Sequence, residues 1–315
     1  MPFVSRVSGE LIVEPSALEQ FADRLANIPM AIAPVETDDP WRDYEMLDDL
    51  IYDVGMHTGE DTEFYLKKGF RVVGIEANAQ LCEECAHKFS AAIGSGQLQI
   101  INKAISHTAG TIDFFVNEQV SIWGTANLEW VKRNEARGFK SHPVKVEATT
   151  IKDVILKFGM PYYMKVDIEG MDSVCLEGLL SVEEKPKYIS VEASGTSIKD
   201  TFTQLHLLDR LGYTRFKIVP QLNITEQRCP DPAREGIFVD HRFEGGSSGL
   251  FGEEVPGEWR PLNSVKWDYR RIHLDYRMVG PNNGIFRNFP SRKIKRLLET
   301  VFWNGLEWHD THATF

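Results

Sequence analysis

Hydrophobic residues in this chain form short runs that alternate with segments of helical periodicity. Four runs, at residues 50–54, 71–76, 98–105 and 162–168, lack the polar alternation of a half-exposed strand, so we expect strands covered on both faces. Between such runs, apolar side chains recur at the spacing of amphipathic helices. This alternation predicts an α/β protein with a mostly parallel, doubly wound sheet. Further strands are predicted at residues 111–116, 144–148, 188–191, 216–219 and 236–239, and helices at residues 16–28, 59–68, 127–137, 151–158 and 291–302.

Three parts of the chain differ in pattern. Residues 1–45 contain the predicted helix at 16–28 and then a Pro-rich, acidic linker, whereas residues 46–242 contain the alternating strands and helices. Residues 243–315 form an aromatic-rich C-terminal extension that begins with a flexible Gly/Ser hinge. We expect the loop at residues 247–259 to act as a lid over a bound substrate, because exposed loops seldom carry Leu, Phe and Trp in so short a span unless these side chains pack on something.

The composition and charge favour a protein that acts on small molecules. The chain has 315 residues, 42% of them hydrophobic, and its formal net charge of −11 opposes non-specific binding to nucleic acid or to an anionic membrane. No stretch has the length and hydrophobicity of a signal peptide or a membrane span, so a cytoplasmic location is expected. Four cysteines in a chain of this size do not make a disulfide framework. We therefore expect a small-molecule partner, and no nucleic acid or membrane.

A turn bracketed by glycines follows the first strand of the predicted sheet. Asp53 ends the strand, Gly55 and Gly59 enclose the turn, and a helix begins at once, which is how a nucleotide-type ligand is held at the edge of a parallel sheet. The G-x-G-x-x-G pattern of dinucleotide-binding enzymes is absent, which argues against NAD. The wide glycine spacing, with a second acid 23 residues after Asp53, instead suits S-adenosylmethionine. Asp53 is expected near the methionine part of that cofactor, and Glu76 is expected to accept hydrogen bonds from both ribose hydroxyls.

The apolar strand that begins at Tyr162 also ends in acids, and its sequence indicates a family. Residues 164–172 read Met-Lys-Val-Asp-Ile-Glu-Gly-Met-Asp and follow the two nucleotide-binding blocks. With further blocks at residues 53–62, 73–78, 102–106 and 149–153, the chain resembles a class I S-adenosylmethionine-dependent methyltransferase of the FkbM family. The resemblance covers about residues 50–192. It implies a Rossmann-like, seven-stranded class I methyltransferase fold, with S-adenosylmethionine as the cofactor.

The resemblance also implies which residues bind the cofactor. The turn would bind the amino-acid part, Glu76 the ribose and the region of Asn102 and Ala104 the adenine edge, while Asp167 would lie between the cofactor and the methyl acceptor. The family usually has Asn at the position of His57, a residue that can change charge. The cofactor-binding residues expected on this basis are Asp53, Gly55, His57, Gly59, Thr62, Glu76, Asn78, Asn102, Ala104 and Asp167.

Methyl transfer to a hydroxyl needs correct positioning of the two substrates and a base that removes the acceptor's proton. Asp167, Glu169 and Glu192 end neighbouring strands on the expected cofactor side, and we expect Asp167 or Glu169 to be the catalytic residue. In the alternative interpretation, Glu169 caps a helix and Asp167 only orients the cofactor's amine. The same three acids could hold a divalent cation, but no metal is expected because they already have roles toward the cofactor.

The sequence therefore predicts an S-adenosylmethionine-dependent O-methyltransferase that acts on a hydroxyl of a sugar or another small metabolite. One alternative is a catalytically silent, S-adenosylmethionine-binding partner subunit. A less favoured alternative is a nucleic-acid methyltransferase, which is opposed by the negative charge and by the absence of the Asn/Asp-Pro-Pro-Tyr/Phe block that holds a flipped base.

Overall fold

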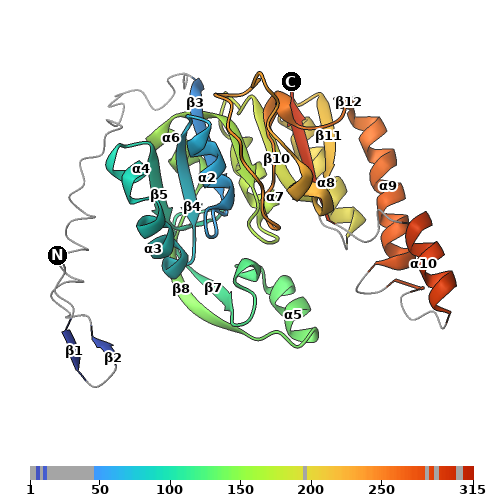
Figure 1. The fold of residues 1–315 in the computed structure, drawn as a ribbon, viewed down its shortest axis with the longest axis horizontal. Coiled ribbons are helices and arrows are strands. Elements are labelled where there is room, and N and C mark those ends of the chain that lie inside the picture. Colours follow the sequence, from blue (N-terminus) through green and yellow to red (C-terminus); the bar gives the residue numbers. More distant parts are fainter. Residues whose placement is uncertain are drawn as a thin grey trace.

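The fold is an α/β structure built around one eight-stranded sheet (Figure 1). The computed structural model describes residues 5–7, 10–12, 46–193, 197–280, 284–286, 291–302 and 308–315. The predicted helix at residues 16–28 and the linker after it lie outside these ranges. In spatial order the strands are β12 (Arg260–Pro261), β11 (Arg215–Pro220), β13 (His309–Thr314), β10 (Tyr188–Ala193), β9 (Met160–Val166), β3 (Met46–Val54), β4 (Arg71–Glu76) and β5 (Leu98–Asn102).

The sheet is parallel from β10 through β9, β3 and β4 to β5, whereas β13 runs antiparallel between β10 and β11. The short strand β12 adds an antiparallel edge beyond β11. The predicted Rossmann-like, mostly parallel and doubly wound sheet is confirmed. It has eight strands in place of the predicted seven.

Helices cover both faces of this sheet because the side chains of its parallel strands are apolar in both directions. One face packs against α6 (Ile151–Phe158), α7 (Asp172–Leu179), α8 (Ile198–Arg210) and α9 (Leu262–Val279). The other face packs against α2 (Glu60–Lys67) and α3 (Ala79–Lys88), the latter followed by the short helix α4 (Ser90–Gly94). The two cores are separate groups of buried side chains, one on each face.

Residues 243–255 complete the face of the sheet that carries α2. Leu250 and Phe251 are buried in that core, where the Phe251 ring stacks on Tyr163 of β9 and makes an edge contact with Tyr65 of α2. The sequence places these apolar side chains in a lid over the substrate, and the structure instead places them inside the protein. These apolar side chains lie close together in the sequence because this loop, like a helix, covers part of the α2 face of the sheet.

Strand β13 is the second difference from the sequence-based expectation. Residues 236–239 are predicted to form a strand but form none, and Ile237 and Phe238 are 60% and 47% exposed. The position inside the sheet is taken by His309–Thr314, all six of whose side chains are buried. The end of the predicted C-terminal extension is thus an inner strand of the main sheet. Helix α9 was also not predicted, whereas α10 (Arg292–Val301) was.

An insertion between β5 and α6 projects from the sheet edge at which β3, β4 and β9 end (Figure 1). It contains a three-stranded sheet of β6 (Ala104–Ile105), β8 (Ser141–Thr149) and β7 (Gly110–Asn117), in that order. The 3₁₀ helix η1 (Ser121–Trp123) and the helix α5 (Leu128–Ala136) connect β7 to β8. This insertion faces the carboxyl ends of the parallel strands, where ligands of open α/β sheets bind.

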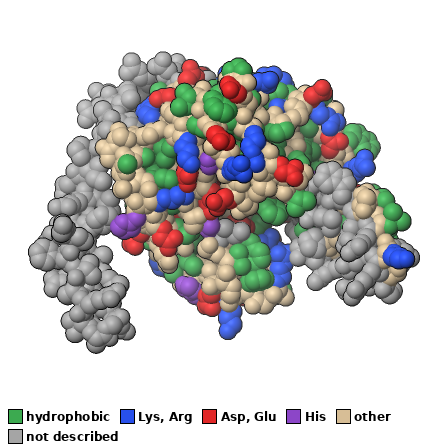
Figure 2. Space-filling view, in the orientation of Figure 1, with side chains coloured by type: hydrophobic (Ala, Val, Ile, Leu, Met, Phe, Trp, Pro, Cys, Tyr) green, Lys and Arg blue, Asp and Glu red, His purple; other side chains and the backbone are tan. Residues whose placement is uncertain are grey.

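The remaining elements are short. Strands β1 (Ser5–Val7) and β2 (Glu10–Ile12) pair with each other, and the 3₁₀ helices η2 (Gln221–Glu226) and η3 (Gly252–Glu254) lie in connections. None of the helices that the structure describes combines the length and hydrophobicity needed to cross a lipid bilayer. On the face shown in Figure 2, Lys and Arg side chains are interspersed with Asp and Glu.

A row of polar side chains, from Lys165 through Ser190 and His312 to Lys217, crosses the sheet on the α2 face. His312 of β13 lies opposite Ser190 of β10 and Lys217 of β11, and it is 1% exposed. Burial, followed by the charge of Lys217, lowers the pKa of His312 to about 3. A histidine with a lowered pKa stabilises the fold above its unfolded pKa of about 6.5, and this stability is lost as the pH falls toward 3.

We therefore expect His312→Gln to weaken the acid sensitivity of folding. Between pH 7.5 and 5.5 the wild type should lose about 1.4 kcal/mol more of its free energy of unfolding than the variant does, because the unfolded His312 takes up a proton in this range. Chemical unfolding followed by tryptophan fluorescence at the two pH values measures the difference. His142→Gln, at an exposed position, is the control and should behave as the wild type. Equal losses in wild type and His312→Gln would contradict the buried, neutral histidine.

Candidate active site

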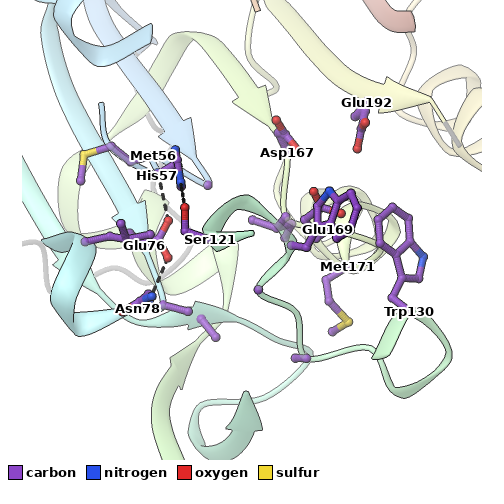
Figure 3. Close-up of a pocket in the computed structure, with 18 of the residues that line it drawn as sticks. Met56, His57, Glu76, Asn78, Ser121, Trp130, Asp167, Glu169, Met171 and Glu192 are labelled. Carbon is purple, nitrogen blue, oxygen red and sulfur yellow. Dashed lines mark hydrogen bonds between the residues drawn. The ribbon is translucent and has the colours of Figure 1, made fainter. Parts of the chain in front are cut away.

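A cavity of about 430 Å³ lies between the carboxyl ends of the parallel strands and the β7–α5–β8 insertion (Figure 3). Its volume falls within the range of about 300–1,000 Å³ that is usual for small-molecule sites. One end is formed by the turn after β3 and the end of β4. The other end is formed by the acids that follow β9 and β10, with aromatic rings from the insertion above them.

The turn after β3 needs glycine at its first position. Gly55 has a φ of 89°, and a Cβ there would lie 1.8 Å from the carbonyl oxygen of Asp167, so no other residue fits between β3 and β9. The N–H groups of Gly55 and Met56 both donate to the carbonyl of Ile75, at 2.9 and 3.1 Å. These contacts fix the turn against β4 and β9 and leave Gly55, Met56 and His57 on the cavity wall.

Glu76 ends β4 with its carboxylate at the cavity wall. One oxygen accepts a hydrogen bond from the N–H of His57 at 3.0 Å and the other accepts one from the N–H of Asn78 at 2.8 Å (Figure 3). A carboxylate oxygen can accept more than one hydrogen bond, so each retains capacity for a ligand hydroxyl. Burial raises the pKa of Glu76, while the two backbone N–H groups favour its charged form. The geometry fits the predicted ribose contact, which stays a prediction.

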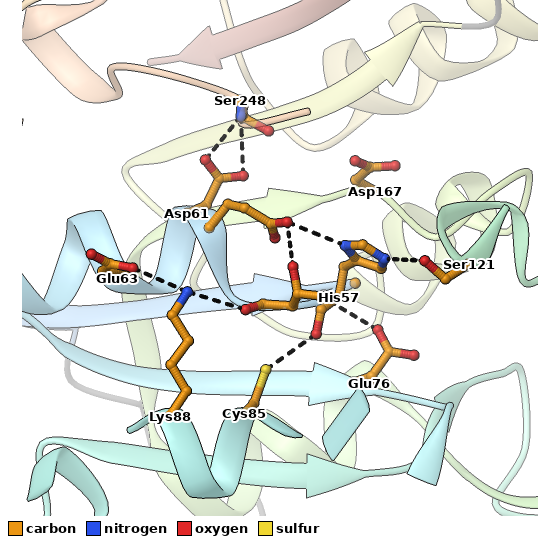
Figure 4. Close-up of polar contacts among 12 residues, drawn as sticks. His57, Asp61, Glu63, Glu76, Cys85, Lys88, Ser121, Asp167 and Ser248 are labelled. Atoms are coloured by element: carbon orange, nitrogen blue, oxygen red, sulfur yellow. Dashed lines mark hydrogen bonds and ion pairs between the residues drawn. The ribbon is translucent and has the colours of Figure 1, made fainter. Parts of the chain in front are cut away.

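The ring of His57 joins the turn to the insertion. Its Nε2 lies 2.9 Å from Oγ of Ser121 in η1, and its Nδ1 lies 3.5 Å from a carboxylate oxygen of Glu60 (Figure 4). Burial alone would raise the pKa of Glu60, but hydrogen bonds from His57 and Thr58 lower it to about 2. His57 thus closes the turn end of the cavity by holding Ser121 against it.

Several residues predicted to touch the cofactor lie behind the cavity wall. Asp53 is fully buried, and its carboxylate accepts a hydrogen bond of 2.6 Å from the Thr62 hydroxyl. The Asn102 amide donates to the carbonyl groups of Glu76 and of the next residue, at 3.0 and 3.1 Å. Gly59 begins α2 beneath the turn. Of the ten predicted residues, those that line the cavity are Gly55, His57, Glu76, Asn78, Ala104 and Asp167.

Lys165 connects the turn to the acids, and the sequence analysis did not assign it a role. Its Nζ lies 3.2 Å from the carbonyl oxygen of Gly55, 3.2 Å from Asp61, 3.3 Å from Asp53 and 3.9 Å from Asp167. Burial would lower the pKa of Lys165, but the carboxylates of Asp53 and Asp61 raise it well above its usual value, so the side chain is charged. A lone lysine within an otherwise apolar strand is the signal that could have identified it.

Asp61 extends this network to the C-terminal part of the chain. Its carboxylate accepts hydrogen bonds from the N–H of Ser248 at 2.9 and 3.1 Å (Figure 4). Ser248 belongs to the segment that packs on the α2 face, and Gly246 before it lines the cavity. The C-terminal segment therefore supports the turn end of the site through Asp61 and Lys165.

Asp167, Glu169 and Glu192 gather at the other end of the cavity (Figure 3). Asp167 follows β9, Glu192 lies near the end of β10, and Glu169 projects from the loop before α7. Burial, followed by the charge of Asp167, raises the pKa of Glu169 well above its usual value. Burial, followed by the charges of Asp167 and Glu169, does the same to the pKa of Glu192. The predicted catalytic residues Asp167 and Glu169 thus lie together with Glu192 in one group of carboxylates that repel one another when charged.

The loop that carries Glu169 is held by the insertion. Glu169 has a φ of 48°, and its carbonyl accepts a hydrogen bond of 2.7 Å from the Thr125 hydroxyl. Gly170 follows with a φ of 87°, and a Cβ there would lie 2.5 Å from Nε1 of Trp130. The glycine of the Asp-Ile-Glu-Gly block is required because the Trp130 ring packs directly on its backbone.

Aromatic rings roof the acidic end of the cavity, and the sequence analysis did not identify them. Trp130 of α5 carries the guanidinium of Arg133 at 3.6 Å from its ring, and Trp123 makes an edge contact with Phe139. Tyr276 and Trp308, from the C-terminal part of the chain, also line the cavity. These rings come from three separate regions, which is why no local pattern marks them.

Comparison with known proteins agrees with this geometry. The model of the FkbM methyltransferase domain matches residues 53–215, just over half of the chain. No curated protein matches the chain. Solved structures that resemble it include the methyltransferase FkbM from Methylobacillus flagellatus KT, with 16% identity, a TM-score of 0.38, and coverage of 56% of this chain and 40% of that one.

Two other solved structures are similar to the chain at lower identity. The precorrin-6y C5,15-methyltransferase from Geobacter metallireducens GS-15 is 8% identical, with a TM-score of 0.33, over 56% of this chain and 69% of that one. The putative sarcosine dimethylglycine methyltransferase from Galdieria sulphuraria is 8% identical, with a TM-score of 0.34, over 95% of this chain and 84% of that one. On the match of the domain model over residues 53–215, the chain belongs to the FkbM methyltransferase family.

Proposed function

We propose that this protein transfers the methyl group of S-adenosylmethionine to a hydroxyl of a sugar or another small metabolite and releases S-adenosylhomocysteine. Membership of the FkbM methyltransferase family supports the methyl-transfer chemistry. The observation that carries the proposal is that one cavity joins two chemically different ends, a nucleoside-type end at Glu76 and an acidic, aromatic end at Asp167 and Trp130.

The turn end fits the nucleoside and amino-acid parts of the cofactor. Glu76 would accept hydrogen bonds from the ribose hydroxyls with the capacity left beside its two backbone donors. Ala77, Ala104 and Phe114 supply apolar surface at the same end, which suits an adenine ring. The backbone of Gly55 and the buried Lys165–Asp61 pair would position the amino-acid part, with Asp53 supporting them from below.

The acidic end fits a hydroxyl-rich acceptor. Sugar rings present apolar C–H faces that pack on aromatic rings, and their hydroxyls donate hydrogen bonds to carboxylates. Trp130, Tyr276 and Trp308 offer the rings, and Glu169 and Glu192 offer the carboxylates. This combination favours a sugar over an apolar metabolite, because an apolar acceptor would leave the carboxylates without partners.

The chain's residues perform two tasks in the proposed reaction. When bound, the cofactor supplies an electrophilic methyl group on a sulfonium. The carboxylate of Asp167 or Glu169 would accept the proton that the acceptor hydroxyl loses as its oxygen is methylated. The aromatic roof and the insertion would hold the acceptor in line with the breaking bond and exclude water.

Calorimetry with S-adenosylmethionine tests the cofactor site, and Glu76→Ala is the informative variant. We expect Glu76→Ala to weaken binding by about 100-fold, because two hydrogen bonds to a charged carboxylate contribute about 1.5 kcal/mol or more each. Glu83→Ala, at an exposed position on α3, is the matched control and should bind as the wild type. Glu76→Gln, which keeps an acceptor for one backbone N–H, shows whether the loss follows from ligand contact or from a disturbed turn. Undiminished binding by Glu76→Ala would exclude the ribose contact.

Methyl transfer itself is tested with a labelled methyl donor. The protein is incubated with this donor and cell extract, and labelled metabolites and S-adenosylhomocysteine are measured by mass spectrometry. A labelled sugar ether is the expected product. Cofactor binding without any labelled product would favour the catalytically silent partner subunit, and label in nucleic acid would overturn the choice of acceptor.

A further inference from the structure

Three carboxylates follow one another across the edge of the main sheet. Val166 pairs with Val191 in the β9–β10 ladder, so the next residues, Asp167 and Glu192, lie side by side. Glu192 in turn lies directly opposite Asp310 in the antiparallel β10–β13 ladder, which places their side chains on the same face. Acids on three adjacent strands therefore follow one another here, with Asp167 and Glu192 lining the acceptor end of the cavity and Asp310 next to Glu192.

Asp167, Glu169 and Glu192 converge closely enough to share one cation. One carboxylate oxygen from each lies within 4.8 Å of the others (Figure 3). Oxygens on opposite sides of an ion are separated by about twice the metal–oxygen distance, which is about 4.0–4.2 Å for Mg²⁺ and about 4.6–5.2 Å for Ca²⁺, so a spread of this size suits the larger ion. The three oxygens thus fit around one ion, with cavity space left for the oxygens of a ligand.

Arg133 lines the same cavity and its charge favours the charged form of Glu169, but among the described residues no positive side chain forms a close ion pair with Glu169 or Glu192. Lys165 is 3.9 Å from Asp167 and is shared with Asp53 and Asp61. Within the described residues, the side chains of Glu169 and Glu192 make no hydrogen bond or ion pair. Like charges at this spacing repel unless a cation or a proton joins them.

Asp310 is a second and independent observation that points to a cation site. It is only 6% exposed, and in the part of the chain that the structure describes its carboxylate makes no hydrogen bond or ion pair. A buried carboxylate is costly unless it is paired. Burial, followed by the charge of Asp167, raises the pKa of Asp310 well above its usual value, in agreement with its place opposite Glu192.

We propose that Asp167, Glu169 and Glu192 bind a divalent cation that prefers oxygen ligands and tolerates flexible geometry, such as Ca²⁺ or Mn²⁺, with Asp310 beside them adding to the negative field. Binding of the ion depends only on these side chains. Its role rests on the proposed function: the ion would bind the acceptor's hydroxyl, or two neighbouring hydroxyls of a sugar, and would make the reacting hydroxyl easier to deprotonate.

Titration of Mn²⁺ into the full chain without cofactor tests the site, with free Mn²⁺ followed by its electron paramagnetic resonance signal. We expect one ion per chain. Glu192→Gln and Glu169→Gln should each weaken Mn²⁺ binding by more than tenfold, because each removes a charged ligand. Asp310→Asn should weaken it by about tenfold, which is the usual effect of losing a group that lies next to the metal ligands. Glu118→Gln, an exposed acid of the insertion, is the matched control and should leave binding unchanged.

Thermal melting and calorimetry with S-adenosylmethionine on the same samples separate the possible outcomes. Two variants, Glu192→Gln and Glu169→Gln, are measured so that the conclusion about Mn²⁺ binding still stands if thermal melting shows that one of them is misfolded. No stoichiometric Mn²⁺ binding by wild type, or equal Mn²⁺ affinity in wild type and both variants, would overturn the cation site and leave the acids as partners of the cationic cofactor. A chain that binds Mn²⁺ but not S-adenosylmethionine would contradict the proposed function and leave the cation site standing.

Discussion

Glu169→Gln is expected to lower kcat by about 10²–10⁴-fold, with a smaller loss in Asp167→Asn. General bases contribute rate factors of this size, and a neutral amide cannot accept the proton of the acceptor hydroxyl. Glu169 makes no ion pair among the described residues, whereas Asp167 lies 3.9 Å from Nζ of Lys165, whose positive charge makes its carboxylate a weaker base. Steady-state kinetics with the acceptor identified by the labelled donor provide the measurement.

Three further measurements assign the cause of any loss. Asp113→Asn replaces an exposed acid of the insertion and should retain full turnover. The affinity of Glu169→Gln for S-adenosylmethionine should match that of the wild type, because the base acts on the acceptor. If Glu169→Gln loses turnover but keeps its affinity for Mn²⁺, Glu169 acts as a base and not as a metal ligand. Unchanged turnover in both Glu169→Gln and Asp167→Asn would exclude either carboxylate as the catalytic residue.

The parts of the fold that follow from local patterns were predictable from the sequence. The strands that carry Asp53 and Glu76 at or near their carboxyl ends are apolar runs followed by the turn and loop of the site, and both are inner, parallel strands of the sheet. The turn at Gly55 and the block around Asp167 each follow a predicted parallel strand, and both lie at the carboxyl edge of the sheet as expected. Local hydrophobic periodicity is sufficient in these cases because the buried side chains of parallel strands are nearly all apolar.

Strand β13 shows what local patterns miss. Its sequence, His-Asp-Thr-His-Ala-Thr, is polar and does not read as an inner strand, yet it pairs with residues 89 or more positions earlier in the chain. His312 of this strand continues the polar row on the α2 face from Lys165 to Lys217, whereas Ala313 packs in the apolar core of the other face. Residues 236–239 show the converse, an apolar run that stays outside the sheet.

The candidate site divides in the same way. Gly55, Glu76 and Asp167 belong to contiguous blocks, and the sequence identifies all three. Trp130 and Asp310 reach the site from the insertion and from the last strand, so their positions depend on long-range packing that no spacing encodes. The same applies to Lys165, which joins Asp53, Asp61 and Asp167 only after the turn and β9 are in place.

Lys68→Met is expected to lower the free energy of unfolding by about 3–5 kcal/mol, the largest effect on stability that we predict. Lys68 at the end of α2 and Glu254 of η3 form an ion pair of 2.9 Å, and both side chains are fully buried. Removing one member leaves the other as an uncompensated charge in the core, which is the costly change for buried ion pairs. Urea unfolding followed by tryptophan fluorescence measures the loss.

The double variant Lys68→Met/Glu254→Gln separates the ion pair from simple packing. Glu254 also accepts hydrogen bonds from the N–H groups of Arg234 and Glu235, at 2.9 and 3.1 Å, and Gln keeps an acceptor for them. The double variant should therefore lose much less stability than the sum of the single variants. Lys145→Met, which breaks an exposed ion pair with Asp113, is the control and should change stability by less than about 1 kcal/mol.

The position of this ion pair links stability to the site. It fastens the segment that contains Ser248. The N–H of Ser248 donates a hydrogen bond to the Asp61 carboxylate, which pairs with Lys165, and Lys165 in turn donates to the carbonyl of Gly55 in the turn. Loosening the segment removes a hydrogen-bond donor from Asp61 and frees Lys165 to move. Lys68→Met should thus weaken S-adenosylmethionine binding even at temperatures at which the protein remains folded, and Lys145→Met should not. Cofactor affinity that survives in Lys68→Met, despite the loss of stability, would show that the turn is held by β4 and β9 alone.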